Sequence, residues 1–396
     1  MVNVTAVLIR SAALAATLVL AAGCGGEPDT VRGLLKSLAS MDAAARGAAI
    51  EAFIARKGGT PIVEQQSRAT FFARDINGQP PRIVGDFNNW AAGANGLDPA
   101  AGVTTRVEGT DWSYFETSIY TNARAEYVLL LPDETRPDPL NPRTVQAFTG
   151  PRSEVRMPQW SGHPEIDDTS AVPAGRLVAE TVASRALGAA RRVWFYTPPG
   201  YDDGDEWYPV VYVLDGGNYV ERMQVPAILD RLVARRAIPP VVAVFVEPGE
   251  RQEEYSRNPR WRAFMATELV PMVDGRFRTF PAPEKRVVLG SSLSAYGAVD
   301  LAVEYPGVFG LCAALAPPAQ TPTVITNQAK GQDAIRKVKF FVLAGTYDAM
   351  ANGGRRLRTA LDMGTGAVTY AEVPEGHSAE TFRGRIDDAL RALLAE

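Results

Sequence analysis

The chain has 396 residues, of which 46% are hydrophobic and 22% are charged, an ordinary balance for a globular protein of about two domains. Its formal net charge is −4, which excludes the broad basic field that nucleic-acid-binding proteins need. Only two histidines are present and they lie far apart in the sequence, which offers no ligand cluster for a metal. No cofactor is expected.

The first 23 residues are predicted to be an export signal. Arg10 is followed by a run of small and apolar residues that is too short to span a bilayer. Small residues directly before Cys24 resemble a bacterial lipobox, in which Cys24 becomes the lipidated first residue of the mature protein. The alternative is cleavage by ordinary signal peptidase, with Cys24 incidental. We therefore expect an exported lipoprotein of the bacterial cell envelope or periplasm, attached to the membrane through its lipid anchor only.

Residues 24–66 are predicted to form a polar tether and a short helical segment. Apolar side chains recur at helical spacing from Leu34 to Ile54, and Gly58 and Gly59 stop the pattern. In residues 67–156 the sequence pattern changes to short β runs that are separated by Asp, Asn, Gly and Pro. This rhythm is typical of a small β-sandwich of the immunoglobulin-like kind.

A proline-rich linker, residues 157–174, contains His163 and leads into the largest unit, residues 175–396. There, near-continuous apolar β runs alternate with helical segments. Such runs favour a mostly parallel sheet that is covered by helices on both faces, with ligands bound at the carboxyl ends of the strands. The predicted fold is an α/β-hydrolase preceded by the β-sandwich.

A candidate nucleophile follows the apolar run at residues 286–289. Gly290 ends the run, Ser292 comes two positions later, and a helix-like segment follows, as in the nucleophile elbow of α/β-hydrolases. The usual motif is Gly-x-Ser-x-Gly, and here Ser294 replaces the last glycine. Its small side chain should be tolerated, and neither Ser291 nor Ser294 has a glycine two residues before it. We therefore predict that Ser292 is the nucleophile.

A serine nucleophile needs a base and an acid that orients the base. His377 follows the β run at residues 367–373, and Asp348 follows the run at residues 338–344, which gives the expected chain order Ser, Asp, His. His163 lies in the linker, and Asp362, inside a helical stretch, is the weaker alternative acid. The competing interpretations are that His377 is a surface histidine and that Asp348 is an ordinary turn residue.

An oxyanion hole needs two N–H groups directed at the developing charge. We predict the amide of Leu293 and the loop that carries Gly216 and Gly217, although Asp-Gly is also a common turn sequence. Arg251 and Tyr255 are candidates for substrate contact. The alternative for them is a structural salt bridge to Glu254 or Glu268.

Three motifs resemble an esterase family that includes enterochelin esterases, feruloyl and acetylxylan esterases, and mycolyltransferases: residues 191–201, residues 212–216, and Gly290-x-Ser292. Residues 251–258 and 268–271 are similar to the enterochelin-esterase-like branch. Upstream, residues 59–63, 85–90 and 138–142 resemble the N-terminal immunoglobulin-like domain of those enzymes. The turn at 85–90 also resembles glycogen-binding modules, so Trp90 is either a sugar-stacking residue or, as is commoner, a core residue.

The resemblance implies Ser292 as nucleophile, Asp348 as acid and His377 as base. Departures occur at Ser294 and Ala295, where relatives usually carry glycines, and at residues 378–382, where many relatives have a tryptophan. We predict an exported serine carboxylic-ester hydrolase that forms an acyl-enzyme and acts on a siderophore lactone or a polysaccharide-linked ester. The alternatives are an acyltransferase on the same fold and a glycan- or partner-binding lipoprotein whose hydrolase domain is no longer catalytic.

Overall fold

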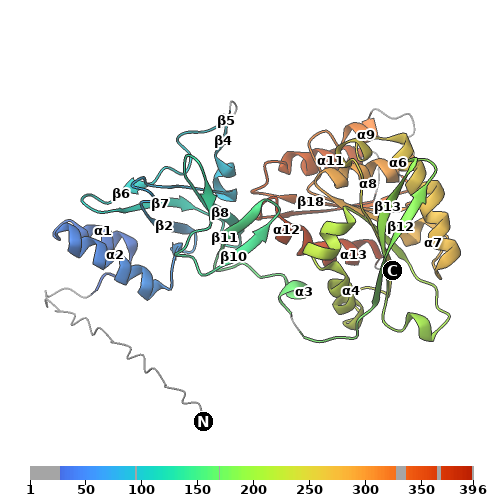
Figure 1. The fold of residues 1–396 in the computed structure, drawn as a ribbon, viewed down its shortest axis with the longest axis horizontal. Coiled ribbons are helices and arrows are strands. Elements are labelled where there is room, and N and C mark those ends of the chain that lie inside the picture. The colour runs from blue at the N-terminus through green and yellow to red at the C-terminus, as the bar shows by residue number, and fades with distance from the viewer. Residues whose placement is uncertain (1–26, 94–95, 169, 327–335, 364–366, 395–396) are drawn as a thin grey trace, which may run out of the picture.

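In the computed structural model, the structure describes residues 27–93, 96–168, 170–326, 336–363 and 367–394. The predicted export signal and Cys24 lie outside these residues. Figure 1 shows two N-terminal helices, a β-rich unit, and a larger unit in which helices pack on a long sheet. None of the helices in the described ranges is long and apolar enough to cross a membrane.

The two N-terminal helices are α1 (Val31–Leu38) and α2 (Ala43–Lys57). Thr30 and Asp42 cap them, each side chain accepting a hydrogen bond from a backbone N–H in the first turn. Gly58 caps the C-terminal end of α2, and its left-handed backbone (φ 81°) suits glycine. Their apolar faces pack against Phe72 and Trp112 of the β-rich unit.

The β-rich unit is a sandwich of two antiparallel sheets, with strand orders β1-β2-β7-β6 and β10-β11-β8-β3 and with β9 beside β8. Its strands are β1 (Ile62–Glu64), β2 (Arg68–Arg74), β3 (Arg82–Gly85), β6 (Thr105–Arg106), β7 (Trp112–Ser118), β8 (Arg124–Leu130), β9 (Thr135–Arg136), β10 (Thr144–Ala147) and β11 (Gly150–Arg156), beside a small hairpin of β4 (Ala92–Gly93) and β5 (Gly96–Leu97). Phe71, Tyr127 and Leu129 lie in the core between the sheets. Helix α3 (Pro164–Asp167) lies in the chain that leads to the larger unit.

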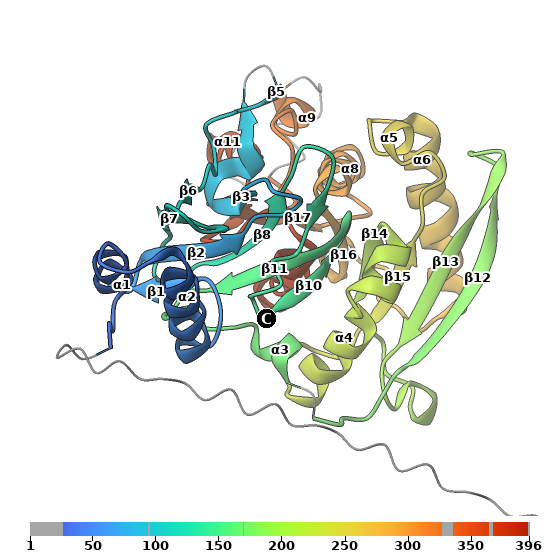
Figure 2. The ribbon, with the colours of Figure 1, turned by 60° about the vertical axis from the view of Figure 1, so that its left-hand side comes forward.

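The larger unit is built on one eight-stranded sheet of order β12-β13-β15-β14-β16-β17-β18-β19. Strand β13 pairs antiparallel with β12 and β15, and every other pairing is parallel. The strands are β12 (Arg176–Ser184), β13 (Ala189–Thr197), β14 (Val210–Leu214), β15 (Val242–Val246), β16 (Arg286–Ser291), β17 (Leu311–Leu315), β18 (Lys339–Gly345) and β19 (Val368–Val373). In Figure 2, β12 and β13 form the outer edge of this sheet.

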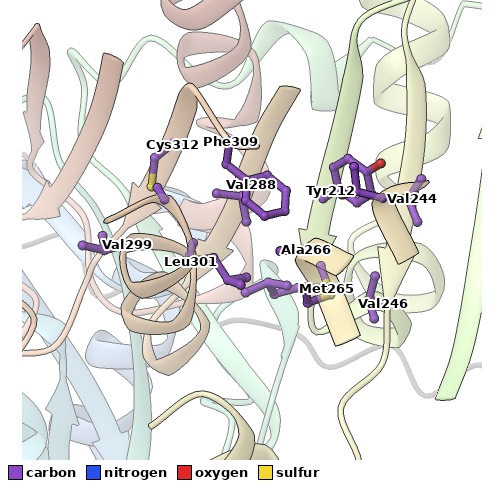
Figure 3. Close-up of a cluster of buried hydrophobic side chains, with 14 of the residues drawn as sticks. Tyr212, Val244, Val246, Met265, Ala266, Val288, Val299, Leu301, Phe309 and Cys312 are labelled. Atoms are coloured by element: carbon purple, nitrogen blue, oxygen red, sulfur yellow. The ribbon is translucent and has the colours of Figure 1, made fainter. Parts of the chain in front are cut away.

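Helices cover both faces of the sheet, which explains the near-continuous apolar strands. They are α4 (Val225–Ala234), α5 (Arg251–Glu254), α6 (Pro259–Ala263), α7 (Val270–Arg276), α8 (Leu293–Glu304), α9 (Thr323–Thr326), α11 (Ala351–Met363), α12 (Ala379–Arg383) and α13 (Ile386–Leu394). One core lies under α8 and α11 and is partly drawn in Figure 3; in it the rings of Tyr212 and Phe309 meet edge to face, with centroids 5.6 Å apart. The other lies under α4 and α13. The predicted α/β-hydrolase fold is confirmed.

Candidate active site

Ser292 lies between the end of β16 and the start of α8, at the carboxyl edge of the sheet. Its backbone has φ 55° and ψ −125°, a conformation that residues with a side chain rarely adopt. The Ser292 N–H donates to the carbonyl of Leu315 at 2.9 Å, which fixes the turn to the neighbouring strand. This strained strand-to-helix turn is the geometry of a nucleophile elbow.

The elbow is tight because the first turn of α8 lies directly against the end of β16. A Cβ atom at Gly290 would lie 2.2 Å from the carbonyl oxygen of Ser294, so only glycine fits there. The Ser294 side chain is fully buried; its hydroxyl accepts from the Ser291 N–H (2.9 Å) and donates to the Ser291 carbonyl (2.8 Å). The serine that replaces the usual glycine therefore ties the helix to the strand.

Asp348 and His377 come together at the same edge of the sheet, after β18 and β19. Their hydrogen bond joins His377 Nδ1 and Asp348 Oδ2 at 2.7 Å. Asp348 is buried, and its other oxygen accepts from the Met350 N–H at 2.7 Å. The alternative acid, Asp362, is instead on α11 and pairs with Arg358 at 3.3 Å, where both side chains are half exposed. Asp362 is therefore excluded as the partner of the histidine.

Ser292 and His377 line one cavity of about 310 Å³. Its other lining residues are Phe148, Asp215, Asn218, Tyr219, Met223, Arg251, Ser291 and Phe382. The ring of Phe382 meets the His377 ring edge to face, with centroids 5.0 Å apart. Because Nδ1 of His377 is engaged by Asp348, its Nε2 is the ring nitrogen available to the cavity.

Neither glycine of the predicted oxyanion loop is among the residues that line this cavity. The Gly217 N–H donates to Glu247 Oε2 at 2.6 Å, so the prediction for Gly217 is wrong in this structure. Gly216 is packed against β15, where a Cβ atom would lie 2.7 Å from the Phe245 carbonyl carbon, so this close approach requires glycine, and the oxyanion role of its amide stays a prediction. Leu293 is the first residue of α8, where a helix leaves its N–H groups without internal partners.

Of the two residues predicted to contact substrate, Arg251 lines the cavity and Tyr255 does not. Arg251 lines the cavity and donates from Nε and Nη2 to the two carboxylate oxygens of Asp215, both at 2.7 Å. Tyr255 is fully buried, and its hydroxyl accepts from the Asp215 N–H at 2.8 Å. Tyr255 therefore supports the turn at Asp215, and its predicted role in substrate contact is wrong. Arg251 pairs neither with Glu254 nor with Glu268, the two partners that the sequence had suggested.

Phe148 reaches the cavity from the sandwich, at the tip of the hairpin formed by β10 and β11. Arg222 of the larger unit lies over its ring at 5.4 Å and donates to the Ala147 carbonyl at 3.1 Å. Sequence reasoning missed this residue, because an apolar side chain in a turn carries no functional signal. Trp90, the candidate for sugar stacking, has Arg152 over its ring at 4.1 Å, so this face of the ring is occupied.

A family model described as "Putative esterase" matches residues 184–391. The chain is 26% identical over 271 residues to the iron(III) enterobactin esterase of Escherichia coli (strain K12), a match that covers 64% of this chain and 66%, just under two thirds, of that protein. The structure resembles ferric enterobactin esterase from Salmonella typhimurium with a TM-score of 0.70 at 22% identity, over 87% of this chain and 98% of that one. A ferulic acid esterase matches with a TM-score of 0.51 at 19% identity, over 56% of this chain and 98% of that one. Because the family model matches more than half of its length, the chain belongs to the putative esterase family.

Proposed function

We propose that this protein is a serine carboxylic-ester hydrolase that works through an acyl-enzyme. The observation that carries the proposal is the 2.7 Å hydrogen bond from His377 to the buried Asp348, together with the single cavity that both His377 and Ser292 line. Membership of the esterase family supports the same activity. A serine, a histidine and a buried carboxylate in this arrangement are what nucleophilic catalysis on an ester requires.

In the proposed reaction, His377 Nε2 takes the hydroxyl proton of Ser292 as the serine oxygen attacks the ester carbonyl. Asp348 keeps the Nδ1 proton in place and stabilises the imidazolium that forms. The tetrahedral intermediate collapses, the C–O bond to the alcohol breaks, and the alcohol leaves with the proton from Nε2. Water then attacks the acyl-enzyme, with His377 taking its proton, and the carboxylic acid departs as Ser292 is regenerated.

The oxyanion of each tetrahedral intermediate is proposed to be held by the Leu293 amide at the start of α8. The positive end of that helix favours the developing negative charge. We infer that the side-chain amide of Asn218, which lines the cavity and follows Gly217, supplies the second donor. This assignment replaces the Gly217 amide, which Glu247 engages.

The proposed substrate is a siderophore lactone. Phe148, Tyr219, Met223 and Phe382 give the cavity aromatic and apolar walls that suit an aromatic acyl group. A neighbouring cavity of about 580 Å³ shares Asn218 and can take the remainder of a larger molecule. The relative's name gives iron(III) enterobactin as its ester. A polysaccharide-linked ester is the second candidate, and the hairpin that carries Phe148 disfavours it because a polymer chain needs an open groove.

A fluorophosphonate probe tests the mechanism directly, since it modifies only an activated serine. Wild type is expected to be labelled and Ser292→Ala not, while the exposed control Ser256→Ala labels like wild type. The absence of labelling in folded wild-type protein would refute the proposal. Turnover of an enterobactin-like trilactone, methyl ferulate and short p-nitrophenyl esters then ranks the substrates, and product analysis with sugar alcohols present separates hydrolysis from acyl transfer.

We further infer that the protein is exported and anchored by lipid on Cys24. The support is the sequence alone, in which Arg10 and an apolar run precede small residues and the cysteine. Metabolic labelling with radioactive palmitate in a bacterial host is expected to mark wild type but not Cys24→Ser. Equal labelling of the two proteins would contradict the anchor.

A further inference from the structure

The loop that carries His377, residues 374–378, lies against strand β8 of the sandwich. Arg124, the first residue of β8, donates from its backbone N–H to the Pro374 carbonyl at 3.2 Å. Its side chain reaches across to the Ser378 hydroxyl, which accepts from Nη1 at 3.3 Å. Arg124 is almost fully buried and is paired with Glu126 and Glu154. One rigidly held residue thus contacts both ends of the histidine loop, Pro374 through its backbone N–H and Ser378 through its side chain.

The middle of the loop is also held, through Gly376. A Cβ atom at Gly376 would lie 2.1 Å from the Asp86 carboxylate carbon of the sandwich. The Gly376 backbone is outside the left-handed region, so close approach is what requires glycine at this position. Asp86 cannot easily yield, since it is buried and its two oxygens accept from the Glu126 N–H (2.7 Å) and the Trp90 indole (2.9 Å).

Two further contacts reach the catalytic loops from the N-terminal half of the chain. The Tyr120 N–H donates to the hydroxyl of Tyr347, the neighbour of Asp348, at 2.9 Å. In the linker, His163 Nε2 lies 3.2 Å from Glu375 Oε2, and both side chains are buried. Burial alone would raise the pKa of Glu375, but His163 and Arg385 hold it at about 2. The Glu375 carboxylate therefore stays charged in its contact with the linker.

We propose that the sandwich and the linker are part of the catalytic apparatus, with Arg124, Asp86 and Tyr120 acting as positioning residues for His377 and Asp348. The inference rests on the proposed function, because it concerns the geometry of that same triad. Asp348 and His377 each sit on a loop beyond the end of a strand, where the sheet itself fixes the backbone weakly. Since a shift of about 1 Å at a catalytic group can cost about 100-fold in rate, external support at these loops has a direct catalytic effect.

The decisive variant is Gly376→Ala, which inserts a methyl group between the histidine loop and Asp86. We expect kcat for p-nitrophenyl acetate to fall by about 10- to 100-fold. KM should stay within about twofold, because neither residue lines the cavity. The rate of modification by a small sulfonyl fluoride should fall in parallel with kcat. Gly307→Ala is the matched control, since a Cβ atom there meets nothing within 4 Å.

Rescue distinguishes positioning from a general loss of structure. Asp86→Ala combined with Gly376→Ala removes the clashing carboxylate and puts the methyl group added at position 376 in its place between the loop and the sandwich, so it should recover most of kcat. Asp86→Asn combined with Gly376→Ala keeps the bulk of the side chain and should stay impaired. Equal rates for the two double variants, or a wild-type kcat for Gly376→Ala, would overturn the inference.

Tyr347→Phe provides a second test that removes one hydroxyl and leaves the ring contact with Tyr120. We expect kcat to fall by about three- to tenfold without a change in KM, since one hydrogen bond to the acid loop is lost. An unchanged kcat would remove the acid loop from the proposal. Wild-type protein that is not modified by the sulfonyl fluoride would refute the serine mechanism itself; active wild type with unaffected variants refutes only the positioning role.

Discussion

Replacing Ser294 by alanine tests how the nucleophile elbow is held. The substitution deletes the two hydrogen bonds of the hydroxyl, to the Ser291 N–H at 2.9 Å and the Ser291 carbonyl at 2.8 Å. Each bond contributes about 1 kcal/mol net, and a buried N–H left without a partner costs about 1–3 kcal/mol. We therefore expect the free energy of unfolding to fall by about 2–4 kcal/mol.

Catalysis should respond as well, because the Ser292 backbone at φ 55° is strained and depends on its surroundings to stay there. We expect kcat to fall by about tenfold. Ser294→Gly, which creates the usual motif of the family, should be at least as unstable as the alanine variant, since glycine adds backbone entropy to the unfolded chain.

Guanidinium unfolding followed by tryptophan fluorescence, with kcat measured on the same preparations, provides the assay. A free energy of unfolding for Ser294→Ala within about 0.5 kcal/mol of wild type, the range of an ordinary surface substitution, would show that Ser294 does not brace the elbow. A more stable Ser294→Gly variant would likewise show that the serine crowds the elbow and does not brace it.

Asp348→Asn should lower kcat by about 10⁴-fold through the wrong histidine tautomer, while Asp362→Asn, at an exposed ion pair, should change it by less than about twofold; steady-state hydrolysis of p-nitrophenyl acetate measures both. Phe148→Ala should lower kcat/KM for methyl ferulate by about two- to tenfold and leave an aliphatic methyl ester unaffected, and equal losses on the two substrates would argue against ring contact. Burial, and secondarily Glu126, raises the pKa of Asp86 from 3.8 to about 7. Because its pKa is raised in the folded state, the neutral Asp86 side chain stabilises the fold fully at pH values below 3.8. That contribution, about 4 kcal/mol in all, is lost as the pH rises to about 7. The stability difference between wild type and Asp86→Ala should therefore shrink as pH rises from 5 to 8, and a constant difference contradicts this titration.

The sheet and the pairing of Asp348 with His377 are accessible from sequence because both depend on local pattern. Apolar runs mark buried strands, and groups that follow parallel strands meet at one edge. Gly217 was misassigned because its amide is taken by Glu247, a residue beyond the end of β15 that no local spacing associates with it. Tyr255 was misassigned for a similar reason, since only the folded chain places its hydroxyl under the turn at Asp215.

The contribution of the sandwich to the site depends on how the two units dock, and docking leaves no periodic signal in the sequence. Phe148 and Asp86 illustrate this limit, since one is an apolar residue in a turn and the other an acid in a loop. Gly376 is a sequence trace of docking, because its backbone conformation does not require glycine and its contact with the sandwich does.

The hairpin that carries Phe148 lets the substrate-contacting surface vary while the catalytic residues stay in place, two requirements that usually conflict in an enzyme. Residues 144–146 of β10 are mostly exposed, and the turn at Gly150 (φ 123°) has nothing near it that a Cβ atom would strike. Its tip can therefore change in sequence with little effect on stability, while the elbow and the histidine loop stay fixed. Selection for a new ester can act on this hairpin and leave the chemistry untouched.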